Sequence, residues 1–544
     1  MSDSESKSPG GPAASGKTVL DSGEDLNPYR WLILVGLITA TILEILDTTI
    51  VNVSLPQMAG NLGATTEEIG WVATGYILSN VIVLPMTAWL SGLFGRKRYL
   101  TGSILLFIAA SFFCGTSRGL TELVFWRIIQ GAGGAALLST SQATLREIFP
   151  REQQGMVQAV YMMGIIVAPT VGPTLGGYIT DNYNWPWIFF VNIPIGLVSA
   201  TIVYGFLQDA HYQKRSLSID WWGIGLLALG LGCLQYVLEE GNRNDWFDSS
   251  MIVTLSVISA IALISMVAWE LSPRNEHPVV NFHVLKNRDL SAASFLFVAL
   301  GFGLYGGIFI FPLFSQNILH FTPTLTGLTL LPGGVASGFS ALVCGRLFNP
   351  GRQIVPARVL IGFGLGMFVL SMWILGHLNS TSNSDNAQFG LIVRGLGLGF
   401  LFTPINLAAL STLRGPEIPQ GTSLMNLMRQ LGGSFGIAVL GTYVTNDTNT
   451  HRTALIAHVA PGNPIYQNTL MHLTHELQAN GLTFIAAQKA AVGLIAQMLE
   501  IQAMTMSYDD AFLLIGMAVV IVSPTIFLMR NRMPARLPVN SDGH

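Results

Sequence analysis

Residues 31–55 read WLILVGLITATILEILDTTIVNVSL, a run of 25 residues with no basic side chain. A helix needs about 20 mostly apolar residues to cross the hydrocarbon core of a bilayer, where every backbone polar group must be paired within the protein. The run is therefore long enough to span a membrane. Its two acidic residues, Glu44 and Asp47, are three positions apart and share one face of the helix. The stretch predicts a first membrane span that carries acidic groups halfway along its length.

Thirteen further apolar runs follow, so the sequence predicts an all-α integral membrane protein with fourteen transmembrane helices. The composition supports this, because 50% of the 544 residues are hydrophobic and only 10% are charged, against roughly 25% in soluble proteins. The net charge of −3 provides no basic surplus for nucleic acid, and the three cysteines lie inside apolar runs. The further runs have the approximate limits 70–91, 99–117, 121–143, 155–180, 186–207, 221–238, 251–271, 290–315, 325–345, 354–377, 388–411, 421–445 and 510–530.

The lysines and arginines predict the orientation of the chain. With the N-terminus in the cytoplasm, twenty of the 27 fall in cytoplasmic loops and tails, four fall on the opposite side and three lie inside spans. Membrane proteins concentrate basic residues in their cytoplasmic loops. We therefore expect an even number of spans, with both termini in the cytoplasm.

Two similar stretches indicate an internal repeat. Trp126-Arg127 is followed by Leu145-Arg146, and Val393-Arg394 is followed by Leu413-Arg414 at nearly the same spacing. This register makes spans 1–6 equivalent to spans 9–14, with spans 7 and 8 inserted between them, and two halves of six recur in transporters. The predicted organisation is a disordered cytoplasmic tail at 1–28, a six-helix bundle at 29–207, a linker with the inserted helix pair at 208–285, a second six-helix bundle at 286–530 and a cytoplasmic tail at 531–544.

The second bundle includes a hydrophilic loop at 447–508, which lies outside the membrane in this topology. Helical periodicity from Phe484 to Thr505, with Gly481 as a breaker, predicts a small helical hairpin there. The hairpin is either a folded cap without chemistry or a docking surface for an extracytoplasmic partner. His472 and His475 are spaced like metal ligands on a helix, but a solvated loop face is the simpler interpretation, and no metal or cofactor is expected.

Charged residues inside the spans are the main functional candidates. An ionised carboxylate at the depth of Glu44 or Asp47 costs on the order of 3 kcal/mol or more, so both should face water or a cation. Arg127 in span 4 is the natural counter-ion. One interpretation is a structural ion pair that only joins two helices. The other is proton coupling, because two acids exceed what one arginine needs and the pair can then take up and release a proton.

Polar and flexible side chains elsewhere in the spans are candidates for lining a substrate cavity, although ordinary helix packing is the simpler explanation for the methionines. In span 5, small residues recur every four positions, and added Gly-Pro and Gly-Gly pairs favour a hinge or a tightly sealed helix crossing. The candidate lining residues are Tyr76, Gln130, Tyr161, Met163, Tyr305, Asn426, Arg429 and Gln430, and the small-residue set of span 5 is Gly164, Gly172, Pro173, Gly176 and Gly177.

Four stretches together resemble the major facilitator superfamily, in its fourteen-span drug:proton antiporter branch of the EmrB/QacA type. They are residues 46–56 in span 1, 127–133 in span 4, 164–177 in span 5 and 187–196 at span 6. The resemblance covers the chain from the first span to the last. It implies that Asp47 takes part in proton coupling, that Arg127 helps to tune it, and that a substrate cavity lies between the two six-helix bundles.

The loop after span 2 departs from the pattern of this family. It keeps the Gly95-Arg96-Lys97 of the family's gating motif, but Gly92 stands where an Asp is usual. The charge relay that steadies the inward gate is therefore not expected in its usual form. EmrB-like members of Gram-negative bacteria work with a periplasmic membrane-fusion adaptor and an outer-membrane channel, and the 447–508 loop resembles theirs, which implies such partners here.

The sequence contains no Gly-x-x-x-x-Gly-Lys-Ser/Thr signature, so ATP is not the expected energy source. We predict a proton-driven antiporter, not an enzyme, that exports amphipathic or cationic drugs and toxic organic compounds across the cytoplasmic (inner) membrane. Two alternatives stay open. One is a proton-coupled transporter of a single metabolite, siderophore or peptide, and the other is a non-transporting membrane sensor with the same fold, against which the intramembrane acids argue.

Overall fold

The computed structural model describes residues 27–150, 153–208, 220–275, 278–347, 355–411, 413, 417–457, 459–460 and 462–529, and these residues form helices joined by short turns. Of the two predicted tails, the one at 531–544 and all but the last two residues of the one at 1–28 lie outside the described residues, as does much of the predicted linker before position 220.

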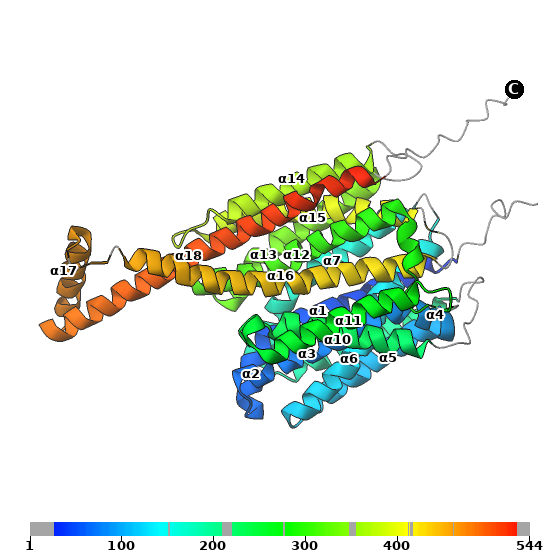
Figure 1. The fold of residues 1–544 in the computed structure, drawn as a ribbon, viewed down its shortest axis with the longest axis horizontal. Coiled ribbons are helices and arrows are strands. Elements are labelled where there is room, and N and C mark those ends of the chain that lie inside the picture. The colour runs from blue at the N-terminus through cyan, green and yellow to red at the C-terminus, as the bar shows by residue number, and fades with distance from the viewer. Residues whose placement is uncertain are drawn as a thin grey trace, which may run out of the picture.

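The N-terminal helices form one bundle (Figure 1). The apolar segment Trp71–Phe94 is interrupted by a 3₁₀ turn at Leu84–Met86, where Pro85 cannot donate a backbone hydrogen bond. The helix Gln154–Asn182 is bent by 42° between Pro169 and Val171. The elements are α1 (Arg30–Leu62), α2 (Thr66–Ile69), α3 (Trp71–Val83), α4 (Thr87–Phe94), α5 (Arg96–Thr116), α6 (Leu120–Ile148), α7 (Gln154–Asn182), α8 (Trp187–Phe190) and α9 (Asn192–Phe206).

The rest of the chain forms an inserted helix pair and a second bundle. The pair is α10 (Trp221–Glu240) and α11 (Ser250–Glu270), with 3₁₀ turns at Trp246–Asp248 and Phe282–Lys286. The second bundle contains α12 (Arg288–Asn317), α13 (Pro323–Leu347), α14 (Ala357–Leu375), α15 (Ser384–Ser411), α16 (Glu417–Ile456), α17 (Pro464–Ala479), α18 (Phe484–Val522) and a final 3₁₀ turn at Ser523–Leu528.

Within the described parts of the chain, eleven helices are long and apolar enough to cross a membrane, or twelve if the bent α7 counts as one span. Two more long helices, α6 and α16, pack among them and are the ones that would complete the predicted fourteen. Both are comparatively polar, and much of each is buried against other helices rather than exposed to lipid. The count of fourteen spans stays a prediction.

The predicted helical hairpin is present, and Gly481, with φ +94°, separates its two arms, α17 and α18. Its boundaries differ from the predicted loop, because α16 continues to Ile456 and α18 runs from Phe484 without a break into the last apolar segment. A 40-residue helix such as α16 is about 60 Å long, twice the hydrocarbon thickness. The hairpin therefore projects well beyond the bundles (Figure 1).

Two seams join the bundles. At the first, α7 and α13 pack along their whole lengths, and small residues allow the close approach at Gly155 against Gly345, at Met163 against Gly338 and at Thr174 against Gly327. At the second, α16 packs on α4 and on the turn at Leu84–Met86. The inserted helix α10 covers this second seam, and Gln235 of α10 donates a 2.9 Å hydrogen bond to Ser434 of α16.

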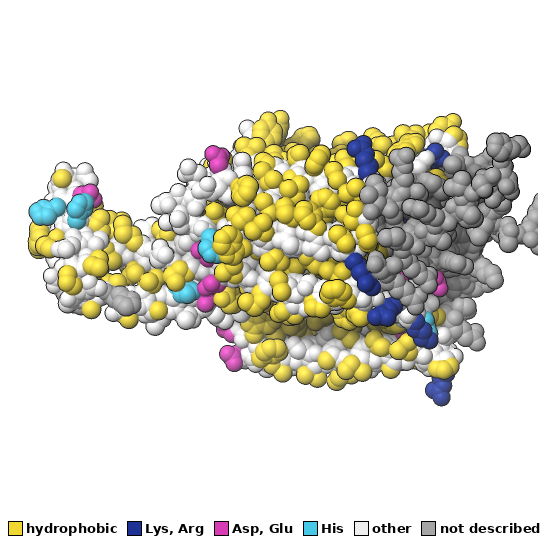
Figure 2. Space-filling model, turned by 90° about the horizontal axis from the view of Figure 1, so that it is seen from above, with side chains coloured by type: hydrophobic (Ala, Val, Ile, Leu, Met, Phe, Trp, Pro, Cys, Tyr) yellow, Lys and Arg dark blue, Asp and Glu magenta, His cyan; other side chains and the backbone are white. Residues whose placement is uncertain are grey.

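The two ends of the molecule differ in charge (Figure 2). We call one the basic end, because the described residues Arg96, Lys97, Arg98, Lys286, Arg288, Arg346 and Arg358 lie at helix termini there. We call the opposite one the hairpin end, where the hairpin leaves the bundles and where side chains of Asp, Glu and His gather in Figure 2. On the face that Figure 2 shows, hydrophobic side chains cover much of the described surface between the two ends, as a bilayer requires.

Candidate functional site

Asp47 lies at the centre of the N-terminal bundle and is 0% exposed. Its Oδ2 accepts a 2.5 Å hydrogen bond from Arg127 Nη1, which makes a fully buried ion pair between α1 and α6. Its Oδ1 accepts hydrogen bonds of 2.9 Å from Gln130 Nε2 and from Asn192 Nδ2. Three donors from two helices therefore satisfy the carboxylate, which compensates the cost of burying it. The predicted pairing of Asp47 with Arg127 is present.

Arg127 is held by groups beyond Asp47. Its Nε donates a 2.9 Å hydrogen bond to the carbonyl of Val72, and its Nη1 also donates to Gln130 Oε1 at 2.7 Å. The guanidinium carbon lies 4.3 Å from the centre of the Tyr76 ring, a favourable position for a cation over an aromatic face. Gln130 and Tyr76, which we expected to line the cavity, therefore lie in the buried ion-pair network.

Glu44 has a different environment one helical turn away. It is 6% exposed, and its Oε1 accepts only a long 3.4 Å hydrogen bond from Asn80 Nδ2. Its Oε2 is buried and has no hydrogen-bond partner among the described residues, and the same holds for Asn80 Oδ1 and the Tyr76 hydroxyl. The cation that attracts Glu44 electrostatically is Arg429 of the other bundle. Glu44 is thus the acid whose charge is coupled to the other bundle, and this charge is incompletely compensated.

Arg429 extends this second layer into the C-terminal bundle. It is buried on α16, and its guanidinium carbon lies 5.9 Å from the centre of the Tyr305 ring of α12. Its Nε has no hydrogen-bond partner among the described residues. Tyr305, Met163 and Gln430, three of the predicted lining residues, are half-buried. They remain candidates for contact with a substrate.

A buried polar cluster closes the basic half of the interface between the bundles. Gln142 Nε2 of α6 donates a 2.5 Å hydrogen bond to Asn406 Oδ1 of α15, and Asn426 Nδ2 of α16 donates a 3.0 Å bond to Gln142 Oε1. Asn426 also donates a long 3.4 Å bond to Ser139. Asn426, predicted as a lining residue, thus belongs to the contact between bundles, and sequence reasoning missed its partners Gln142 and Asn406.

Tyr161, another predicted lining residue, has a structural environment in the N-terminal bundle. It is buried, and its hydroxyl donates a 2.9 Å hydrogen bond to the carbonyl of Leu138 and lies 3.0 Å from the Thr41 hydroxyl. The hydroxyl therefore joins α7 to α6 and α1.

The small residues of the predicted antiporter motif set the spacing between α7 and its neighbours. A Cβ at Gly164 would lie 3.2 Å from the Ile38 side chain, and one at Gly172 would collide with the Thr49 hydroxyl. A Cβ at Gly176 would lie 2.8 Å from the backbone oxygen of Ile50. Pro173 and the buried Gly177 complete the set on the outer half of α7. These residues therefore let α7 pack closely on α1 beside the acids of that helix.

The gating loop lies at the basic end. Gly95 has φ +85° and ψ 141°, a conformation that only glycine adopts readily, and it makes the sharp turn between α4 and α5. Arg96 is buried and forms an ion pair with Glu147 at the end of α6. A Cβ at Gly92 would meet no atom within 4 Å, so the missing Asp is not excluded by space.

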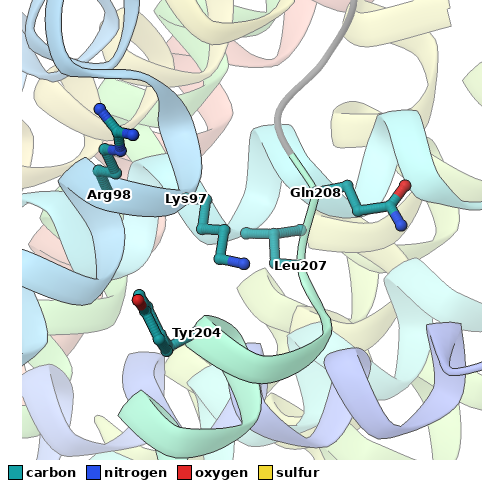
Figure 3. Close-up of a pocket in the computed structure, with 5 residues that line it drawn as sticks. All are labelled: Lys97, Arg98, Tyr204, Leu207 and Gln208. Carbon is teal, nitrogen blue, oxygen red and sulfur yellow. The ribbon is translucent and has the colours of Figure 1, made fainter.

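Lys97 and Arg98 border a cavity of about 370 Å³ between the start of α5 and the end of α9 (Figure 3). The Lys97 amine points into this space and lies 5.0 Å from the centre of the Tyr204 ring. The cavity is at the basic end, far along α5 from the acids of the ion-pair network.

Arg394 occupies the position in α15 that the repeat pairs with Arg127 of α6, but its surroundings differ. It is 5% exposed, and its Nη1 is buried without a hydrogen-bond partner in the described part of the chain. A Cβ at Gly307 of α12 would lie 2.9 Å from this nitrogen. Where α1 presents an aspartate to Arg127, α12 thus presents a glycine to Arg394.

Two helix bundles that surround buried charges at mid-depth define a multi-pass membrane transporter. The chain belongs to the Major Facilitator Superfamily, because the sequence model of that family matches residues 37–437. A solved structure of the superfamily, the proton:xylose symporter XylE, has the same fold, with a TM-score of 0.56 and 12% identity over 92% of this chain and 95% of that one.

Curated relatives are more similar in sequence. The chain is 34% identical to the multidrug export protein EmrB of Haemophilus influenzae over 472 residues, which cover 85% of this chain and 90% of that protein. It is 32% identical to EmrB of Escherichia coli, over 88% and 91%, and 30% identical to the fatty acid resistance protein FarB of Neisseria gonorrhoeae, over 93% and 96%. The resemblance to the EmrB-type branch is confirmed.

Proposed function

We propose that this chain is a multidrug efflux protein of the cytoplasmic (inner) membrane, with the basic end in the cytoplasm, and that it exchanges protons for amphipathic compounds. The names of its relatives, which include multidrug export, fatty acid resistance and colistin resistance proteins, support efflux. The observation that carries proton coupling is the buried Glu44, whose Oε2 lacks a hydrogen-bond partner among the described residues, beside the fully paired Asp47.

The two acids, Asp47 and Glu44, have different roles in this proposal. Asp47 and Arg127, to which the family resemblance assigns a part in proton coupling, form the stable pair that fixes α1 against α6 and so holds Glu44 in place. Glu44 is attracted by Arg429 of the other bundle, so its surroundings change when the bundles move apart. A proton taken up by Glu44 from the outer side removes the attraction to Arg429 and permits the rearrangement that opens the basic end. Release of the proton to the cytoplasm restores the attraction.

The interior charges also bear on the substrate. Away from the helix ends, the buried charges in the described part of the two bundles are the acids Glu44 and Asp47 and the arginines Arg127, Arg394 and Arg429, whereas Arg96 and Asp289 lie at helix starts. This balance favours neutral or acidic amphipathic compounds at least as much as the cationic drugs expected from the sequence. Half-buried Tyr305 and Met163 would provide the apolar contacts of a loosely selective site.

The test is transport by purified protein in proteoliposomes with an imposed proton gradient. A cationic dye, a neutral drug and a long-chain fatty acid are offered separately, and movement of each is measured with and without a protonophore. We expect gradient-dependent transport of at least two compounds, loss of it in Glu44→Gln and Asp47→Asn, and retention in Glu68→Gln, whose side chain is exposed outside the spans.

Each alternative function has its own outcome in this assay. Transport of one compound class only, with strict selectivity inside that class, would indicate a dedicated metabolite, siderophore or peptide carrier. Absence of flux for every compound would favour a membrane sensor. Transport that persists unchanged without the gradient would refute proton coupling.

We further propose that the hairpin docks a periplasmic adaptor that leads to an outer-membrane channel. Apolar side chains of the hairpin point into solvent, notably Ile465 on α17 and Ile485 on α18, which are 75% and 79% exposed. Met471, Phe484 and Met498 of the hairpin are also more than half exposed, and apolar side chains that gather on an exposed element mark protein contacts. Ile465 and Ile485 are the most exposed of these side chains. Replacement of both by Asp should abolish co-purification of the adaptor while transport in proteoliposomes is unchanged.

A further inference from the structure

The base of the hairpin brings together three side chains with metal-binding atoms. Asp447 and His451 are one helical turn apart on α16, and Asp510 lies on α18, 59 residues after His451. Their ligand atoms all lie within 4.8 Å of one another. All three are at the hairpin end, on the two helices that carry the hairpin away from the bundles.

Two of the distances among these atoms are close to those between neighbouring ligands of one metal ion. His451 Nε2 lies 3.1 Å from Asp447 Oδ2 and 3.2 Å from Asp510 Oδ2. In a tetrahedral zinc site with bonds of about 2.0–2.1 Å, neighbouring ligand atoms are about 3.3–3.4 Å apart. The two distances from His451 match this spacing within a few tenths of an ångström, whereas the two carboxylate oxygens lie up to 4.8 Å apart and would approach each other on binding one ion.

The hydrogen bonds of the cluster leave a carboxylate unsatisfied. A ring nitrogen of histidine carries at most one proton, and His451 Nε2 is positioned for a hydrogen bond with Asp510. Asp447 Oδ2 is buried and has no hydrogen-bond partner among the described residues, although it lies 3.1 Å from the same nitrogen. Two acceptors thus converge on one nitrogen that can serve only one of them. A bound cation would satisfy both carboxylates and the nitrogen together.

We propose that Asp447, His451 and Asp510 bind a divalent transition-metal ion of the zinc class, which clamps α16 to α18 at the base of the hairpin. Imidazole with carboxylate oxygens is a ligand set that zinc accepts in three-ligand sites, where water takes the fourth position. The Asp510 side chain is 43% exposed, so water and the ion can reach the cluster from outside the membrane. The ion would fix the direction of the hairpin relative to the C-terminal bundle.

The proposal is tested on the full-length protein in detergent, after removal of the purification tag and treatment with a chelator. Zn²⁺ is titrated by calorimetry, and Co²⁺ is added separately because its visible absorption reports tetrahedral coordination. We expect one tight equivalent of Zn²⁺ per chain, a rise in the thermal unfolding midpoint on binding, and the intense Co²⁺ bands of a four-coordinate site. Removal of one ligand in His451→Gln or in Asp510→Asn should weaken binding by more than about tenfold.

The matched control is His472→Gln. His472 also faces a carboxylate one turn away, with Nδ1 3.7 Å from Glu476 Oε1, but both side chains are exposed and no third ligand among the described residues joins them. This variant should bind Zn²⁺ like the wild type. Equal binding by His451→Gln and the wild type, or loss of binding in His472→Gln, would overturn the proposal, and Asp510→Asn gives a second reading if His451→Gln does not fold.

Discussion

At the scale of single residues, two acids one helical turn apart have opposite environments. Asp47 accepts three short hydrogen bonds and pairs with Arg127, whereas Glu44 has one long hydrogen bond at 3.4 Å. Removing one member of a buried ion pair leaves the other charge uncompensated, which costs about 3–5 kcal/mol. Removing a poorly compensated charge costs far less. The two positions should therefore differ in stability although both are expected to matter for transport.

This difference predicts distinct unfolding behaviour for the two conservative variants. Asp47→Asn should lower the free energy of unfolding by about 3–5 kcal/mol, because Arg127 then loses its carboxylate. Glu44→Gln should change it by less than about 1 kcal/mol, since an amide can still accept the hydrogen bond from Asn80. Thermal unfolding of the two variants in the same detergent measures this. Equal midpoints would contradict the assignment of Asp47 as the structural member of the pair.

Sequence spacing predicted the face that Glu44 and Asp47 share and the partner Arg127, because charges inside apolar runs are conspicuous. It did not identify Asn80 or Asn192, which are neutral amides whose contacts depend on how α1 meets α3 and α9. Gln130 was singled out for a cavity and instead donates to Asp47. The position of a residue on its own helix follows from periodicity, but the helix that it faces does not.

At the scale of helices, close packing depends on glycine where polar helices pass one another. A Cβ at Gly131 of α6 would collide with the backbone carbonyl of Tyr76 on α3, so the two backbones touch at this point. This contact lies one residue from Gln130 and holds the ion-pair network together. Helix α6 can therefore be comparatively polar, because its small and polar residues pack on other helices rather than on lipid.

Gly131→Ala should destabilise the protein by about 1–3 kcal/mol, because the backbone of α3 must move to make room for the added methyl group. The control is Gly102→Ala in α5, where an added Cβ meets no atom within 4 Å. That variant should be neutral or more stable by up to about 1 kcal/mol, since alanine favours a helix over glycine. The comparison is made by thermal unfolding and by the yield of folded protein. A similar loss in both variants would contradict the close contact of α6 and α3.

The helical hairpin and its break at Gly481 were predicted from periodicity and are confirmed. The continuity of α18 through the membrane boundary was not, because periodicity of a helix does not change where solvent replaces lipid. The length of α16 was also missed. Polar residues after position 445 indicated a loop, although the helix continues to Ile456 outside the apolar segment.

At the scale of the whole molecule, the two bundles repeat one plan with different charges. Arg127 pairs with Asp47 in the first bundle, whereas Arg394 in the second has an unpartnered Nη1 among the described residues and faces Gly307. An arginine at the centre of a membrane helix costs about 2.5–3.5 kcal/mol. If the charge is retained for binding acidic compounds, its removal should affect transport of such compounds alone.

Arg394→Met should therefore raise the free energy of unfolding by about 1–3 kcal/mol, because it removes a poorly compensated buried charge. In the same variant, transport of a fatty acid should fall while transport of a cationic dye persists. Arg127→Met is the matched comparison and should be strongly destabilising, because it leaves Asp47 unpaired. A loss of stability in Arg394→Met similar to that in Arg127→Met would show that Arg394 has a structural partner.

The closed contact at the basic half decides which side of the membrane can reach the interior. Gln142 links α6 to Asn406 of α15 and accepts from Asn426 of α16, so one side chain joins the first bundle to two helices of the second. Gln142→Ala removes both bonds, worth about 1–3 kcal/mol together, and should shift the protein toward a state open at the basic end.

A cysteine placed at the buried Thr144 reports this shift through its labelling by a membrane-impermeant maleimide added from the cytoplasmic side. Labelling should be several-fold faster with Gln142→Ala than without it, whereas Gln153→Ala, at a half-buried position at the start of α7, should leave the rate unchanged. Equal rates in all three proteins would mean that the packing of α7 on α13, rather than the polar cluster, keeps the basic half closed.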